Sequence, residues 1–187
     1  VGTGSSSHTA IAVDKISASA TAGAAGSGAA LGDGVATAGD DGVAGEEAKA
    51  YGVYAAGGAV IDLSAKNSGP IKINAKAADG TVTNEAYAVY ADKGTVLFGS
   101  DAELNWDGSS GTDNTLVTGL NNGALGFSGT SADRTVTGGK LQLTGSNAFR
   151  FTTDLANNKA DSMTFDTIEN NSSKQYIQIG YEEAFKD

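Results

Sequence analysis

Apolar and polar residues alternate along the middle of the chain, in short runs separated by turn residues. Residues 59–65 carry apolar side chains at every odd position, and so do residues 71–77 after a turn that contains Pro70, the only proline. Side chains of a β-strand point alternately to its two faces, so a period of two predicts half-buried strands in both places. The pattern therefore predicts short strands joined by turns.

The segment 50–60 is nearly repeated 36 residues later, in 86–96. Seven of the eleven positions are identical, and both copies carry two tyrosines three residues apart. A repeat of this period indicates structural units that stack on one another. One unit holds three short strands and three turns, which fits one coil of a parallel β-helix. The stacking predicts that Tyr87 lies over Tyr51, Val89 over Val53 and Leu97 over Ile61.

The composition and net charge of the chain indicate which classes of binding partner are not expected. The chain has 12 Lys and Arg against 22 Asp and Glu, for a net charge of −10. Nucleic acids and anionic membranes are bound through basic patches, so neither is expected as a partner. Cysteine is absent, which excludes disulfides and thiolate metal sites. The chain starts at Val1 without a signal-peptide pattern, and we expect it to be a processed piece of a larger protein.

Strand-like segments follow one another in a characteristic order in the last third of the chain. Residues 138–146 lead into an aromatic strand, 148–155, which ends in Asp-Leu; Asp161 then opens the next strand, and 176–180 close the run. Over about residues 136–181 this order resembles the C-terminal end of pertactin-like passenger domains of autotransporters, the type V secretion proteins. The resemblance implies a right-handed parallel β-helix and a β-barrel translocator of the same polypeptide, which the given sequence does not contain.

Repeat and resemblance together predict an all-β fold, a right-handed parallel β-helix (solenoid) with a C-terminal capping segment. Residues 1–49, rich in Gly and Ala, are expected to form thin N-terminal coils or a flexible arm. Residues 50–135 are expected to form the coils with the 36-residue repeat, and residues 136–187 the C-terminal cap. Because large apolar residues concentrate in 141–181, this segment is expected to be the most stable cooperative unit.

The resemblance also implies a function. It predicts a non-catalytic passenger that is displayed at the bacterial cell surface, attached to the outer membrane or secreted, and that acts as an adhesin or a structural display stalk in virulence. Its partner would be a host or bacterial surface protein or glycan. The Gly- and Ala-rich opening is also similar to head repeats of trimeric autotransporters, so a trimeric head remains an alternative.

The repeated tyrosines and the single tryptophan are the candidate ligand-binding residues: Tyr54, Tyr90 and Trp106. Stacked, exposed aromatic rings make a flat surface for a sugar or a protein. Tyr51 and Tyr54 are three residues apart, so on a straight strand they face opposite ways. We therefore expect one tyrosine ladder inside the coil and one outside.

A second class of function, a β-helical polysaccharide-acting enzyme, depends on paired carboxylates. Asp101, Glu103 and Asp107 flank Trp106, but the nearest cation in sequence is Lys93. We expect these acids to be exposed and not to converge with another acid or base, and so predict no catalytic residues. The single histidine, His8, has no partners for a triad.

Acidic clusters raise the question of a metal site. Asp40, Asp41, Glu46 and Glu47 form one cluster, and Asp107 and Asp113 form another. Neither has the spacing of a known calcium loop. The sequence therefore predicts no metal and no cofactor.

Overall fold

The computed structural model describes residues 2–3, 8–23, 45, 47–78, 83–105 and 116–181. In these ranges the regular secondary structure is entirely β, as the alternating pattern predicts. The described part of the chain has no helix long and apolar enough to cross a lipid bilayer. The strands, in chain order, are β1 (Gly2–Thr3), β2 (His8–Ala12), β3 (Lys15–Thr21), β4 (Glu47–Ala56), β5 (Val60–Ser64), β6 (Ile71–Ala78), β7 (Thr83–Asp92), β8 (Thr95–Phe98), β9 (Ala102–Leu104), β10 (Leu116–Asn121), β11 (Ala124–Phe127), β12 (Thr135–Asp154), β13 (Lys159–Ala160) and β14 (Ser162–Tyr181).

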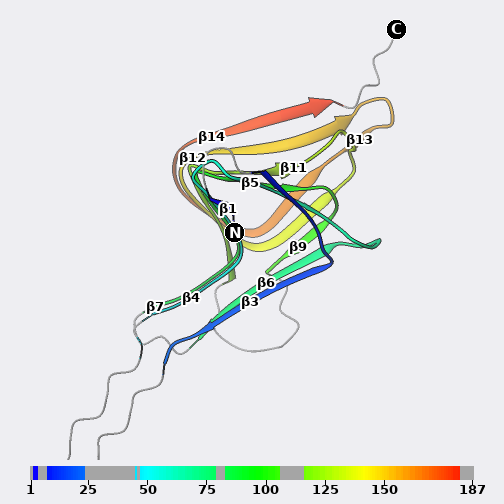
Figure 1. Ribbon diagram of the computed structural model, residues 1–187. Helices are drawn as coiled ribbons and strands as arrows, with labels where there is room; N and C mark the ends of the chain where they lie inside the picture. The colour runs from blue at the N-terminus through cyan, green and yellow to red at the C-terminus, as the bar shows by residue number, and fades with distance from the viewer. Residues whose placement is uncertain are drawn as a thin grey trace, which may run out of the picture.

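Parallel strands lie side by side in three rows, and the rows together form one curled sheet shaped like a half-barrel (Figure 1). The first row contains β1, β4, β7 and β10, the second β2, β5, β8 and β11, and the third β3, β6 and β9. Each strand from β4 to β9 therefore pairs with the third strand before it and the third strand after it. β12, which is 20 residues long, pairs with the last strand of all three rows, and β14 pairs with β12 along most of its length.

The sequence repeat is a structural repeat. Tyr51 is the direct register partner of Tyr87, and Val53 of Val89, as predicted. The prediction that Leu97 lies over Ile61 is wrong, because Val96 takes that place. The turn between β7 and β8 is one residue shorter than the turn between β4 and β5. The spacing of paired residues therefore falls from 36 to 35, and this change points Val96 into the core.

The buried interior has two parts, one with large apolar side chains and one with alanines alone. The main core contains the inward side chains of all three rows, with Leu63, Ile71, Ile73 and Phe98 fully buried. The second part is built only from alanines, where β4 and β7 approach β3 and β6. Because alanine is small, it lets these strands pack closely. The alanines of this second part are Ala18, Ala20, Ala22, Ala48, Ala50, Ala75, Ala77 and Ala86.

β14 forms one edge of the sheet. It pairs with β12 on one side, and no strand in the described ranges pairs with its other side. Ile177 and Ile179 are consequently 69% and 54% exposed, and Phe151 and Phe165 are only partly buried. The predicted stability of 141–181 depends on burial of its apolar residues, but all of the largest fully buried side chains except Asn147 lie between residues 63 and 136.

Candidate functional site

Four tyrosines form one aromatic surface on the outer face of the first row, on β4 and β7. The rings of Tyr51 and Tyr87 stack at a centroid distance of 5.5 Å and an interplanar angle of 4°. The rings of Tyr54 and Tyr90 stack at 5.7 Å and 16°, and those of Tyr87 and Tyr90 lie 4.7 Å apart. Tyr51 is exposed and the other three are half-buried. We call these four residues the tyrosine cluster.

All four tyrosines face outward because β4 and β7 bend between the two members of each pair. In β7 the consecutive residues Ala88 and Val89 are both fully buried, so the alternation of side chains shifts by one position there. At the equivalent position in β4 a Cβ on Gly52 would lie 2.7 Å from the carbonyl oxygen of Ala88 and 2.8 Å from Ile73. Only glycine fits this close approach. The expectation of one inner and one outer tyrosine ladder is therefore wrong.

The neighbouring strand β10 supplies a flat base for the rings. A Cβ on Gly119 would come within 2.5 Å of the Tyr90 ring and 2.8 Å of the Tyr87 ring, so both rings lie directly over this glycine. The hydroxyl of Tyr87 donates to the amide oxygen of Gln142 on β12, at 3.3 Å. The ring of Tyr87 thus reaches across β10 to the strand beyond it.

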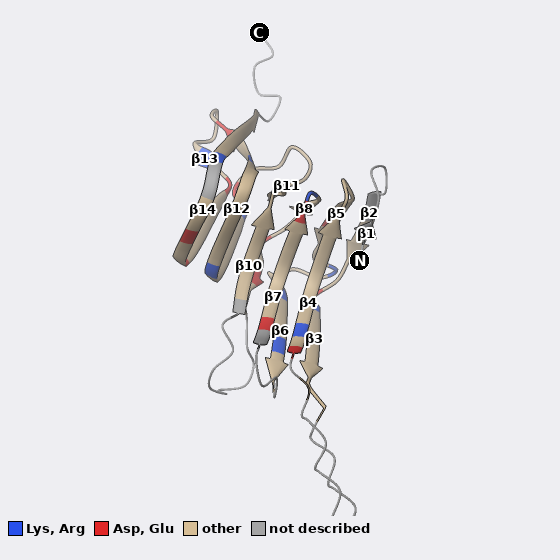
Figure 2. Cartoon of the chain, turned by 90° about the vertical axis from the view of Figure 1, so that its left-hand side faces the viewer, with Lys and Arg blue, Asp and Glu red and all other residues tan. Residues whose placement is uncertain are grey.

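Polar and charged side chains surround the tyrosine cluster. Towards the start of β4 and β7, the ammonium nitrogen of Lys49 lies 3.1 Å from the Glu47 carboxylate and 4.0 Å from the Glu85 carboxylate. Figure 2 shows this face of the first row, with charged residues at the lower ends of β4, β7, β12 and β14. Above the cluster, Asn121 donates to Asp92 at 3.0 Å. The site is therefore an aromatic surface with hydrogen-bonding groups on its borders.

The hydroxyls of Tyr51, Tyr87 and Tyr90 stay protonated at neutral pH, because the pKa of each is raised. Burial, followed by the nearby charge of Glu85, raises the pKa of Tyr87 to about 12. Burial also raises the pKa of Tyr51 and of Tyr90, with Glu85 and Asp92 respectively as the next cause. The cluster therefore offers hydroxyls that donate as well as accept hydrogen bonds.

The candidate acids do not form a catalytic pair in the described part of the chain. Trp106, Asp107 and Asp113 lie outside the described residues. Asp101 is exposed, and its carboxylate accepts the backbone amide of Thr135 at 2.7 Å. Glu103 forms an ion pair with Lys72 at 3.3 Å, so the expectation that it meets no base is wrong. Sequence reasoning missed Lys72, because only the pairing of β6 with β9 brings it beside Glu103.

Of the first acidic cluster, only Glu47 lies among the described residues. Asp40, Asp41 and Glu46 lie outside the described residues, and Glu47 is engaged with Lys49. Within the described ranges, no group of three or more His, Cys, Asp or Glu side chains has an arrangement that would hold a metal ion.

A buried ion pair that the sequence analysis did not single out connects the second and third rows. The guanidinium of Arg134 donates to both carboxylate oxygens of Asp161, each at 3.0 Å, and lies over the ring of Phe127. It also donates to the backbone carbonyls of Phe98 and Ser128. One available signal was that Arg134 and Asp161 each immediately precede a strand, and those two strands pair. The role of this pair is structural.

No protein-family model, curated protein or solved structure matches this chain significantly. A functional proposal therefore depends on the sequence and on the geometry of the molecule.

Proposed function

We propose that the chain is a non-catalytic passenger of a bacterial autotransporter and acts at the cell surface as an adhesin or display stalk. Two features support this proposal. One is the pertactin-like order of segments in 136–181. The other is the set of parallel rows that continue from one repeat to the next. Rows of this kind present long side surfaces, and proteins built from stacked units commonly use such surfaces for binding.

The finer architecture that we propose is a right-handed parallel β-helix. Pairing of each strand from β4 to β9 with the third strand on either side is what a coil of three strands requires. The direct stacking of Tyr51 on Tyr87 supports the same arrangement. In this arrangement residues 136–187 would form its C-terminal part.

The observation that carries the binding function is the tyrosine cluster. Tyrosine combines a large apolar ring with a polar hydroxyl and is enriched at contact surfaces of proteins. Here the repeat places two tyrosines per unit outward, where they contribute little to the main core. A host or bacterial surface protein or glycan is the proposed partner, at the cell surface or in the extracellular medium. The net charge of −10 disfavours nucleic acid.

Adhesion by purified protein tests this function. Beads coated with the chain should adhere to epithelial or bacterial cells more than beads coated with an unrelated acidic protein of similar size. Soluble chain should compete for the same cells. In the producing bacterium, antibodies against the chain should label intact cells. No adhesion above the control on any cell type, together with label only in permeabilised cells, would exclude the proposal.

A further inference from the structure

We infer that the tyrosine cluster binds an uncharged polysaccharide, with sugar rings packed on the tyrosine rings and sugar hydroxyls bonded to the surrounding polar groups. The inference rests on the proposed function, because it names the class of ligand for that binding surface. Four arguments lead to it: the spacing of the rings, the glycine beneath them, the chemistry of the border and the location of the basic residues.

The rings are arranged as two parallel columns. Tyr51 and Tyr87 form one column, and Tyr54 and Tyr90 form the other, with centroid spacings of 5.5 Å and 5.7 Å. Both columns run along the direction in which the strands stack. Pairs of similar rings at nearly equal spacing suit a ligand that is itself a chain of similar rings. A polysaccharide is such a ligand, and its sugars have apolar faces that pack on aromatic rings.

The strand beyond the second pair of rings, β10, presents a glycine beneath them. Gly119 follows Tyr90 in the same row, and its missing side chain leaves room for the rings of Tyr87 and Tyr90 to extend over β10. Val117, the register partner of Tyr87, is 8% exposed. At Gly119 the outer face of β10 is therefore formed by the backbone and by the two rings that lie over it.

The border offers donors and acceptors together, which sugar hydroxyls need because each hydroxyl both donates and accepts. The hydroxyls of Tyr51, Tyr87 and Tyr90 are protonated at neutral pH. Gln142 and Asn121 are half-buried amides beside the cluster, and Asp92 and Glu169 are carboxylate acceptors on the same face. Amides and carboxylates around aromatic rings favour a ligand rich in neutral hydroxyls.

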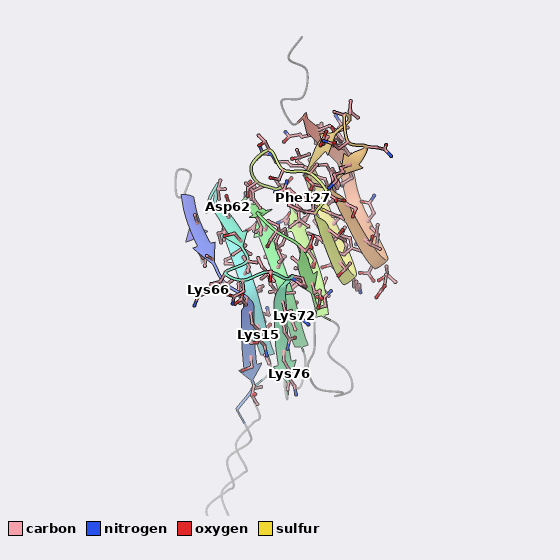
Figure 3. The ribbon with its side chains drawn as sticks, turned by 90° about the vertical axis from the view of Figure 1, so that its right-hand side faces the viewer. Lys15, Asp62, Lys66, Lys72, Lys76 and Phe127 are labelled. Carbon is pink, nitrogen blue, oxygen red and sulfur yellow. The ribbon has the colours of Figure 1, made fainter. Side chains whose placement is uncertain are left out.

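Charge argues against an anionic polysaccharide at this surface. Four carboxylates border the cluster, those of Glu47, Glu85, Asp92 and Glu169, against two cations. Both cations are paired: Lys49 with Glu47 and Glu85, and Lys140 with Glu169 at 2.6 Å. The basic side chains of the third row lie on the opposite side of the molecule. Figure 3 shows that side, with Lys15 on β3 and Lys72 and Lys76 on β6. A sulfated or uronic-acid chain would therefore meet carboxylates at the tyrosine cluster.

Nuclear magnetic resonance with carbon-13-labelled tyrosine tests the inference on the intact chain. The probes are cellohexaose, xylohexaose and N-acetylchitohexaose as neutral chains, with heparin as the anionic control. The chain has six tyrosines. We expect one neutral hexasaccharide to shift the ring signals of the four cluster tyrosines and leave that of Tyr176, which is 51% exposed on β14, unchanged. Heparin should leave the cluster signals unchanged.

Variants of the chain test whether the sugar contacts the tyrosine rings directly or only binds near them. Tyr51→Ser removes the most exposed ring of the cluster and should lower the affinity about tenfold, the effect expected for one good aromatic contact. Gly119→Ala keeps every tyrosine but displaces two rings, and should also weaken binding. Gly180→Ala is its matched control, because a Cβ there would meet only ordinary contacts at 3.7 Å and 3.9 Å. This control should bind as the wild type does.

Three results would overturn the inference: no response to any neutral hexasaccharide, equal shifts with heparin, or shifts that spare the cluster. If beads still adhere to cells and Tyr51→Ser abolishes that adhesion while no sugar binds, the ligand is a protein and the proposed adhesin function survives. If beads do not adhere and no sugar binds, both fail. The two proposals are therefore tested separately.

Discussion

Replacing Asp161 with asparagine should remove a large part of the stability of the fold. The carboxylate of Asp161 accepts hydrogen bonds from the Arg134 side chain at 3.0 Å on each oxygen, and from the backbone amides of Arg134 and Thr152 at 3.0 Å and 2.7 Å. The side chain of Asp161 is fully buried and that of Arg134 is 9% exposed. Asp161→Asn would leave the Arg134 cation buried without a counter-charge.

The size of the effect follows from that burial. Breaking a buried ion pair by removing one partner costs about 3–5 kcal/mol, against a total stability of about 5–15 kcal/mol for a typical domain. Unfolding in urea, followed by circular dichroism, measures the change. We expect a lower midpoint with an unchanged slope, because the surface exposed on unfolding stays the same.

A matched surface pair provides the control. Lys159 and Asp133 lie 2.9 Å apart with side chains 51% and 60% exposed. Asp133→Asn should cost less than about 1 kcal/mol, because solvent screens exposed pairs. Asp133 has a positive φ of 76°, which asparagine tolerates. If Asp161→Asn destabilises the protein no more than Asp133→Asn does, the buried pair is not the connection between rows that the structure indicates.

Three further predictions concern the sheet. Thr118→Val should raise the free energy of unfolding by about 1 kcal/mol, because the fully buried hydroxyl of Thr118 has no hydrogen-bond partner among the described residues; a loss on urea unfolding would contradict this. Lys93→Gly should raise the melting temperature, since Lys93 has a φ of 56°, a conformation that costs about 1–2 kcal/mol for a non-glycine residue; an unchanged or lower melting temperature would contradict it. The folded pKa of Tyr87, about 12, lies above its unfolded value of about 10. Its contribution to stability should therefore be complete below pH ~10 and decline towards pH 12, and Tyr87→Phe should flatten that decline in a pH series of melts.

The sequence predicted those parts of the fold that depend on local alternation and on the repeat. Strands β5 and β6, and the stacking of Tyr51 on Tyr87, followed from these patterns. The register at Ile61 did not, because it depends on one residue fewer in a turn. The common outward face of the tyrosines depends on a shift in the alternation of side chains, at Gly52 in β4 and at Ala88 and Val89 in β7. Nothing in the sequence pattern at these positions predicts that shift. Both failures arose where a single residue changes which face a side chain takes.

Contacts between distant residues were the least predictable. Arg134 and Asp161 are adjacent only because β12 and β14 pair, and Lys72 meets Glu103 only through β6 and β9. Deep burial of the C-terminal apolar residues was expected from their size and pattern. The structure leaves them partly exposed, because burial also needs a neighbouring layer, and no described strand covers β14.

Cell adhesion by a tyrosine-cluster variant tests most directly whether this face of the molecule is its binding surface. The variant replaces Tyr51, Tyr54, Tyr87 and Tyr90 by serine, and the matched control replaces the exposed Tyr176 by serine. Circular dichroism should first confirm that both variants are folded. On beads at equal density, the control should adhere as the wild type does, and the cluster variant should fall to the level of beads without the chain. Wild-type adhesion by a folded cluster variant would contradict the account.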